Sequence, residues 1–536
     1  MPGGRAHPRF DQRDPSLLMM AFGFVGALFT AQGVVNLLQR GRSRLPRSVG
    51  FAEEARVVGS DVRYIVLSDL HLGAENSILT SLQPGTTLAD SQRASPVLSS
   101  LVECLRHVVA ANGGGELPTM IAAGDLVELA LASPALSLPV VAQFAKALAA
   151  GEPVVQDEAV FVPGNHDHHL WEMSRERTAE DFLRAGTPRD QEPASWHTSS
   201  MFLAQPPHYR APLLEDAVHY LRDTERAQVR VVYPDLALTS PDGQRAVFIT
   251  HGHYMEPVGT LFSAMARLAD PSSPPLDSVD LIERENWAWV DFFWGSMGRS
   301  TRTGALIEKL YDSMQDPRAV QAMLGGLALS VTKHQNPLLA RIEGWGIRRV
   351  VGRIVDNKLH ERERNRSDEI LGEGSRRGLA QYFAALRNTF ERQWKRPLPA
   401  DVTMVVGHTH KPFSQWWEEP AWPAGGMRVF NTGGWVVDHV VPQPLMGGAV
   451  VFVSDDLDVV SLRIYQQVST PSLWEIAVET VRPTRGGEAF AEHIRSLVQR
   501  DAPPWSSFAA AVEDVVGERR KDMREILEGG LKLLRE

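Results

Sequence analysis

The sequence predicts an α/β fold on the basis of three observations. Six short apolar runs have the length and composition of buried strands, and they occupy residues 63–69, 118–125, 159–165, 245–252, 401–408 and 427–435. Stretches with the residue pattern of helices lie between many of these runs. Several runs end in Gly, Asp, Asn or His, which places polar groups at the strand ends. Because ligands of layered α/β folds bind just past the carboxyl ends of strands, we expect the functional site there.

The composition of the 536-residue chain is that of a globular protein, with 43% apolar and 22% charged residues. It excludes a disordered, collagenous or coiled-coil chain. The 65 acidic residues exceed the 55 basic ones, and this net charge of −10 argues against nucleic acid as a partner on a broad basic face. Cys104 is the single cysteine, which excludes an internal disulfide framework and a cysteine zinc cluster. A bound metal must therefore be held by His, Asp, Glu or Asn.

The first segment, residues 1–55, contains the one candidate for a membrane anchor, followed by an Arg-rich connector. Residues 17–38 carry no charge, and at about 1.5 Å per residue they can cross a hydrocarbon layer of about 30 Å. Four arginines between residues 40 and 47 favour a cytoplasmic location for the rest of the chain. A cleaved signal peptide, an interfacial helix and a buried helix of a soluble cytoplasmic protein are the alternatives. We expect a protein at the cytoplasmic face of a membrane.

The remaining chain divides into a core in two parts, a large insertion and a tail. The first part of the core spans residues 56–253 and contains a mostly helical insert at about 170–228. The second part spans residues 401–466. Residues 254–400 lie between the two parts and are too many for a structureless loop, so we expect a helical cap or subdomain there. Residues 467–536 form the tail, in which two helices are expected from about residue 485 onward.

Two features of the insertion leave its role open. The aromatic string WAWVDFFW at 287–294 is typical of core packing, and it also suits a lid that faces a membrane or an acyl chain. A basic stretch follows, and it has the composition of a solvated helix face or of a site for a phosphate or an anionic head group. This stretch runs through Arg341, Arg348, Arg349 and Arg353.

Five short strings, each at the end of a predicted strand, carry the residues suited to catalysis. They are SDLHLG at 68–73, GDLVE at 124–128, GNHD at 164–167, THGH at 250–253 and GHTH at 407–410. Together they supply carboxylates, an amide oxygen and imidazoles in numbers that fit two adjacent divalent cations. Two metals about 3.5–4 Å apart bind a shared water, lower its pKa and direct it at phosphorus. Each string alone is weak, because His-x-His is common on exposed strands, but all five in this order favour a metal site.

These strings resemble the motifs of the calcineurin-like metallophosphoesterases, which are Asp-x-His, Gly-Asp-x-x-Asp/Glu, Gly-Asn-His-Asp/Glu, a later His and Gly-His-x-His. The resemblance runs from about Tyr64 to about Tyr465, is interrupted by the two insertions, and extends to the string NTGGW at 431–435. It implies a calcineurin-like α/β/β/α two-sheet sandwich. In this chain the sandwich would carry a large, mainly helical insertion and a helical C-terminal tail.

The resemblance also implies a role for the residues of the strings. The first metal would be bound by Asp69, His71 and His410, the second by Asn165, His251 and His408, and both by a bridging Asp125. His166 would not bind metal but would reach the phosphoryl or leaving-group oxygen, oriented by Asp167. The expected cofactors are two divalent ions, with Mn²⁺ as the first expectation and Fe or Zn²⁺ as alternatives.

Three positions beside these residues need separate interpretation. His253 also qualifies as the ligand of the fourth string, and we favour His251 because it is nearer to the strand end. Glu128 stands where many members of the family have Asp, a variation that affects support of the ligands rather than ligation. His168 and His169 extend the string GNHD and are expected near the ligands or at the rim of the site.

The predicted function is that of a metal-dependent phosphoesterase acting on a phosphate ester or a pyrophosphate. The anchor segment, the aromatic string and the basic stretch together favour a phosphorylated small molecule or a lipid-linked, amphiphilic substrate at the membrane. A nucleic-acid or nucleotide phosphodiesterase is the alternative that the same metal pair would support. A non-catalytic scaffold of this fold is the remaining alternative, and it would have lost ligands that are all present here. No protein partner is predicted.

Overall fold

The described part of the chain excludes both ends and several internal stretches. The computed structural model describes residues 61–113, 115–186, 196–222, 227–270, 272–296, 369–418, 425–467 and 476–533, all within the unit Val58–Glu536. The predicted membrane segment at 17–38 and the basic stretch from Arg341 to Arg353 lie outside these residues. Among the helices of the described ranges, none has the length and apolar character needed to cross a membrane.

The first sheet has eight strands within the described chain, in the order β13-β12-β11-β1-β2-β3-β5-β4. Four neighbouring strands, β1, β2, β3 and β5, are parallel, and the outer ones pair antiparallel. Their bounds are β1 (Val62–Leu67), β2 (Thr119–Ala122), β3 (Glu158–Phe161), β4 (Tyr209–Arg210), β5 (Gln228–Val231), β11 (Gly447–Ser454), β12 (Val459–Gln466) and β13 (Ala477–Glu479). The carboxyl ends of the parallel strands therefore meet at one edge of this sheet.

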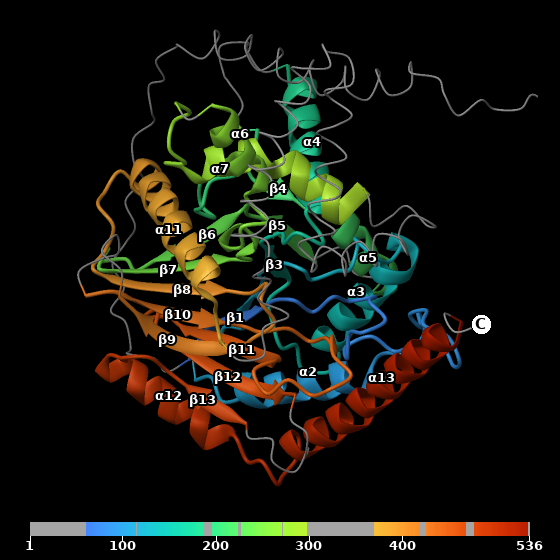
Figure 1. The fold of residues 1–536 in the computed structure, drawn as a ribbon. Coiled ribbons are helices and arrows are strands. Elements are labelled where there is room, and N and C mark those ends of the chain that lie inside the picture. Colours follow the sequence, from blue (N-terminus) through green and yellow to red (C-terminus); the bar gives the residue numbers. More distant parts are fainter. Residues whose placement is uncertain are drawn as a thin grey trace, which may run out of the picture. The chain divides into compact units, whose positions relative to one another are not determined.

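The second sheet has the order β6-β7-β8-β10-β9, with β7, β8 and β10 parallel (Figure 1). Its strands are β6 (Asp235–Thr239), β7 (Arg245–Thr250), β8 (Asp401–Val406), β9 (Phe413–Trp417) and β10 (Met427–Asn431). The six predicted strands are confirmed as β1, β2, β3, β7, β8 and β10. Because all six belong to the parallel parts of the two sheets, the strings that follow them can share one site.

The two sheets pack face to face through an apolar layer. Val66 of β1 and Ile121 of β2 belong to the same buried cluster as Ile249 of β7 and Val405 of β8, and all four are fully buried. Successive side chains of a strand point to opposite faces of the sheet. Ile65, the neighbour of Val66 in β1, therefore points to the outer face of the first sheet. The chain therefore has a mixed α/β fold in which each sheet has an inner face and a face turned to helices.

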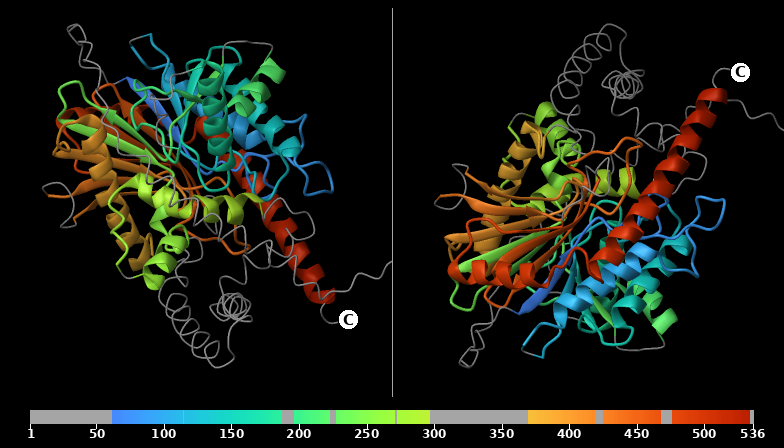
Figure 2. Two further views of the ribbon diagram at one scale, coloured as in Figure 1. Left: turned by 90° about the horizontal axis from the view of Figure 1, so that it is seen from above. Right: turned by 90° about the horizontal axis from the view of Figure 1, so that it is seen from below.

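Helices cover the outer face of the first sheet. They are α2 (Pro96–Val109), α3 (Pro134–Ala149), α4 (His169–Arg184), α5 (Pro212–Arg222), α12 (Arg485–Leu497) and α13 (Trp505–Leu533). Side chains such as Leu101 of α2 and Trp171 of α4 share a buried cluster with Ile65 of β1. The two helices predicted in the tail are confirmed, and α13 lies along α2 (Figure 2).

A second group of helices covers the outer face of the second sheet. It comprises the 3₁₀ turn η1 (His253–Met255), α6 (Leu261–Ala269), α7 (Val279–Val290), the π-helical turn η2 (Asp291–Ser296) and α11 (Glu373–Trp394). Phe383 of α11 packs against Phe248 of β7 in a shared cluster. The described parts of the predicted insertion are thus largely helical, and residues 297–368 lie outside the description.

The aromatic string of the insertion contributes to this second core. Trp289, Phe293 and Trp294 are buried, and their rings contact one another. Phe292, by contrast, is 51% exposed. Core packing, one of the two interpretations of the string, therefore holds for three of its aromatic residues.

Candidate metal centre

The loops that follow five parallel strands carry the predicted metal ligands. Asp69 and His71 follow β1, Asp125 follows β2, Asn165 follows β3, His251 follows β7, and His408 and His410 follow β8. All seven side chains are buried. Two sheets therefore contribute to one cluster of oxygen and nitrogen donors.

Asp69, His71 and His410 form the first group of donors. One donor atom of each lies within 4.8 Å of the others. Nε2 of His410 is 3.3 Å from Oδ1 of Asp69 and 3.3 Å from Nε2 of His71. Two ring nitrogens this close are satisfied when a cation or a proton lies between them. This group matches the ligand set expected for the first metal.

The second group contains Asp125, His251 and His408, again with donor atoms within 4.8 Å of one another. Nε2 of His251 is 3.3 Å from Oδ2 of Asp125, 3.2 Å from Nδ1 of His408 and 2.9 Å from Oδ1 of Asn165. His253 does not belong to this group, because its Nε2 faces the Tyr233 hydroxyl at 3.5 Å. Of the two candidates in the fourth string, His251 is the one that the fold brings to the cluster.

Asp125 lies between the two groups. Its Oδ1 accepts the backbone N–H of His166 at 2.8 Å, whereas Oδ2 is fully buried without a hydrogen bond among the described residues. Oδ2 lies 3.6 Å from Nε2 of His71 and 3.3 Å from Nε2 of His251. An orphaned carboxylate oxygen in this position costs free energy unless a cation completes its coordination. The donors present therefore could hold divalent metal, with Asp125 common to donor groups on either side of it.

The charges of the cluster also favour a bound cation. Burial acts to raise the pKa of Asp69, but the charge of His251 and the hydrogen bond from His410 outweigh it and lower this pKa to about 2. Burial acts to lower the pKa of His251, yet Asp125 and Asp69 raise it to about 9. Burial lowers the pKa of His71. The carboxylates of Asp69 and Asp125, whose pKa is also lowered, thus stay ionised and favour positive charge at the centre of the cluster.

Each of the four predicted histidine ligands has a further oxygen partner behind or beside it. The pairs are His71 Nδ1 with Glu128 Oε2 at 2.9 Å, His410 Nδ1 with Asp438 Oδ2 at 2.9 Å, His251 Nδ1 with the Ala123 carbonyl at 3.2 Å, and His408 Nε2 with Glu256 Oε2 at 3.3 Å. Such partners fix the tautomer and orientation of metal-binding imidazoles. Asp438 and Glu256 were missed by the sequence interpretation. Asp438 follows the string NTGGW closely, which is the one sequence signal that could have indicated it.

The backbone of the ligand loops is strained. Eight non-glycine residues of the described chain have a positive φ, and five of them are Asp69, His71, Asp125, His408 and His410, with φ between 44° and 69°. Each left-handed residue of this kind costs on the order of 1–3 kcal/mol. Strain that is confined so closely to the donor residues indicates a functional cluster rather than a stabilising one.

Glycines next to the ligands permit the close packing of the loops. A Cβ on Gly124 would lie 2.3 Å from the ring of His251, and one on Gly434 would lie 2.6 Å from the ring of His410. Two further glycines, Gly164 and Gly407, approach the carboxylates of Asp125 and Asp69 equally closely. These glycines belong to the strings GDLVE, NTGGW, GNHD and GHTH.

The orientation of His166 requires a correction. The sequence interpretation assigned it to Asp167, but the structure places Glu128 against the ring, with its Oε2 3.0 Å from Nδ1 of His166. The carboxylate of Asp167 instead accepts backbone N–H groups, from Gly164 at 2.7 Å and from Leu126 at 2.7 Å. Burial and the neighbouring Asp125 raise the pKa of Asp167 to about 7. Asp167 therefore ties two ligand loops together.

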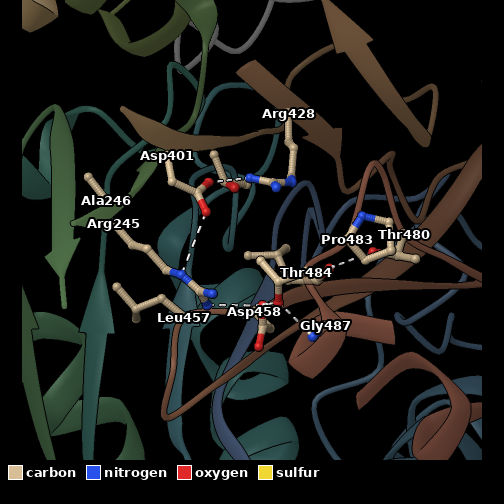
Figure 3. Close-up of a pocket in the computed structure, with 12 residues that line it drawn as sticks. Arg245, Ala246, Asp401, Arg428, Leu457, Asp458, Thr480, Pro483, Thr484 and Gly487 are labelled. Atoms are coloured by element: carbon tan, nitrogen blue, oxygen red, sulfur yellow. Dashed lines mark hydrogen bonds and ion pairs between the residues drawn. The ribbon is translucent and has the colours of Figure 1, made fainter. Parts of the chain in front are cut away.

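A separate small cavity of about 20 Å³ lies at the amino ends of β7 and β8 (Figure 3). Arg245 donates to Asp458 at 3.1 Å, and Asp401 pairs with Arg428. Thr484, which caps α12, donates to the same Asp458 at 2.9 Å. These charges neutralise one another, so the cavity is part of the packing between the second sheet and α12.

No protein-family model matches this chain. A search of curated proteins also finds no match.

Proposed function

We propose that this chain is a metal-dependent phosphoesterase of the calcineurin-like kind, which hydrolyses a phosphate ester or a pyrophosphate. The observation that carries the proposal is the position of Asp125, whose orphaned Oδ2 lies between imidazoles of two donor groups. Donors from five loops and both sheets converge on this point. Buried carboxylates and imidazoles in such numbers are costly without a cation, which supports a metal centre over a structural cluster.

The donor set suits two divalent ions of the Mn²⁺, Fe or Zn²⁺ class, because it combines carboxylate, amide and imidazole ligands. Asp69, His71 and His410 would hold one ion, and Asn165, His251 and His408 would hold the other, with Asp125 shared. Two such ions activate water and neutralise the charge that develops on phosphoryl oxygens.

His166 is suited to act on the substrate itself. Glu128 lies at Nδ1 of its ring, and the backbone N–H of His166 is fixed on Asp125. Nε2 is then the ring atom that can donate a proton to a phosphoryl or leaving-group oxygen. The negative charge of Glu128 would stabilise the imidazolium form of the ring.

An amphiphilic or lipid-linked substrate remains part of the proposal. The insertion exposes large apolar side chains at Phe262, Met265 and Phe292, which are 40%, 41% and 51% exposed. These side chains support an amphiphilic substrate more than a nucleic acid, as does the net charge of −10. Membrane association through residues 17–38 stays a prediction.

The proposal is tested with purified full-length protein, Mn²⁺ and the two chromogenic substrates bis-p-nitrophenyl phosphate and p-nitrophenyl phosphate. We expect hydrolysis of at least one substrate and its loss on chelation. Asp125→Asn should abolish turnover and remove the metal held by the two donor groups beside it, since the shared ligand is lost. The exposed Asp501→Asn is the matched control and should change neither. A metal-loaded protein that hydrolyses neither these substrates nor a panel of nucleotide and lipid-linked phosphates would contradict the proposal.

A further inference from the structure

A third group of potential metal ligands lies outside the seven residues of the proposed centre. His168 and Glu172 belong to the start of α4, and Asp291 begins the π-helical turn after α7. Their donor atoms lie within 4.8 Å of one another. One side of the group comes from the core and the other from the insertion, so chain segments far apart in sequence form it.

His168 shows the arrangement of a metal ligand. Its side chain is 1% exposed, and its Nε2 lies 3.1 Å from Oε1 of Glu283. Its Nδ1 is buried and has no hydrogen-bond partner among the residues that the structure describes. His71 likewise has one ring nitrogen on a buried carboxylate, that of Glu128, and its other ring nitrogen lies in a donor group.

Glu283 is itself held firmly in place. It is fully buried on α7 and accepts hydrogen bonds from the hydroxyls of Tyr233, at 3.0 Å, and of Tyr254. This network fixes the ring of His168. The orphaned nitrogen is therefore a property of the fold and not of a freely rotating side chain.

The two carboxylates of the group lie close to each other. Each offers an oxygen that lies within 4.8 Å of the other. Arg175 donates to Oε1 of Glu172 at 3.1 Å, and Nδ1 of His169 lies 3.6 Å from Oε2 of Glu172 and 3.9 Å from Oδ1 of Asp291. Arg175 compensates part of the negative charge, but adjacent carboxylates beside an orphaned imidazole nitrogen still favour a bound cation.

We propose that His168, Glu172 and Asp291 form a third divalent-cation site, with His169 as a further ligand from the more exposed side. One or two imidazoles with two carboxylates suit Mn²⁺ or Zn²⁺. A cation here links α4, which begins just after the string GNHD, to the π-helical turn of the insertion. Turns of this kind are frequent at functional sites. The site stands independently of the proposed phosphoesterase activity.

The experiment is a count of bound Mn²⁺. Full-length protein is stripped of metal, saturated with Mn²⁺ alone and passed through a desalting column, and metal per chain is measured by mass spectrometry. We expect three ions in the natural chain and two in the Glu172→Gln/Asp291→Asn variant. The matched control is Asp181→Asn, which should hold three ions. Asp181 also belongs to α4, and its side chain is 60% exposed.

Each outcome bears on the proposal. A double variant that holds as many ions as the natural chain would overturn the third site. One ion in the natural chain and none in the double variant would support the third site while contradicting the dinuclear centre. Should the double variant fail to fold, as judged by near-ultraviolet circular dichroism, the single Asp291→Asn variant takes its place, with the same expected loss of one ion.

Discussion

Glu128 supports two histidines of the site at once. Its carboxylate lies 2.9 Å from Nδ1 of His71 and 3.0 Å from Nδ1 of His166. The supporting role of Glu128 could be predicted from its position in GDLVE, but its contact with His166 could not. Spacing shows which residues follow a strand, whereas the direction of each side chain depends on how the loop turns. In the loop of the string GNHD, the carboxylate of Asp167 turns back and accepts the backbone N–H of Gly164, which no sequence pattern indicates.

Replacing His166 with alanine should lower kcat by about 10²–10⁴-fold while both metal ions of the proposed centre stay bound. The reason is that the ring would act on the substrate in the proposed mechanism, whereas Glu128 still holds His71. The measurement is kcat on the chromogenic diester together with the Mn²⁺ content of the same preparation. His219→Ala, on α5, is the matched control and should leave both unchanged. Loss of metal equal to that of Asp125→Asn would contradict the separate role of His166.

Asp235 is a buried carboxyl whose ionisation opposes folding. It is 1% exposed, accepts the Tyr382 hydroxyl at 2.8 Å, and burial raises its pKa to about 7. The folded state therefore binds the proton more tightly than the unfolded state, whose pKa is near 3.8. The stability that this carboxyl contributes is present at low pH and is lost as the pH rises towards 7.

Asp235→Asn should remove this pH dependence. Between pH 5.5 and 8, the free energy of unfolding of the natural chain should fall by about 2 kcal/mol relative to the variant, from 1.36 kcal/mol per pKa unit. Urea unfolding at both pH values, without added metal, measures the difference. The exposed Asp216→Asn variant should follow the natural chain. A pH-independent difference between Asp235→Asn and the natural chain would refute the raised pKa.

Among the elements, the strands that end at the site could be predicted and several others could not. β1, β2, β3, β7, β8 and β10 were indicated by apolar runs with polar ends. β11 and β12 are equally apolar and buried but lack a site residue at their ends, so they were not singled out. The order of the strands could not be predicted either, because β11 pairs with β1 although most of the chain separates the two in sequence. Residue periodicity shows that a segment is a strand but not which strand it pairs with.

The glycine beside β10 should be essential to the loop that carries His410. Gly434→Ala would place a Cβ 2.6 Å from the His410 ring, so the ring must shift away from Asp69. We expect activity to fall more than tenfold and one Mn²⁺ to be lost, with the fold retained. Metal content, turnover and far-ultraviolet circular dichroism check this. Gly517→Ala on α13, where an added Cβ meets no atom within 4 Å, is the control. Full activity in Gly434→Ala would show that the loop accommodates the added methyl.

At the scale of the whole molecule, the layered α/β architecture followed from the sequence and the packing of its insertion did not. The described helices of the insertion cover the second sheet and send Glu283 and Asp291 towards residues that follow the string GNHD. These contacts depend on tertiary packing between distant segments. The placement of the donors in one cluster, by contrast, follows from the shared direction of the parallel strands.

Removing metal should destabilise the whole unit. A ligand at 100 times its Kd stabilises the folded state by about 2.7 kcal/mol, and the strained ligand loops lose this contribution on chelation. The melting temperature should therefore fall with EDTA and recover with Mn²⁺. In Asp125→Asn the response should be much smaller. If the melting temperature of the natural chain is the same with EDTA and with added Mn²⁺, the result contradicts a metal centre.

The division of the ligands between the two sheets has a consequence for biosynthesis. A nascent chain that has emerged as far as residue 254 already contains Asp69, His71, Asp125, Asn165 and His251, but His408 and His410 are still to be translated. Neither ion of the proposed centre could complete its coordination until the ribosome has passed the insertion and β8 has joined β7. If the proposed centre forms, metal acquisition comes late, after the helical insertion has been made, and incomplete chains lack the cation that their carboxylates favour.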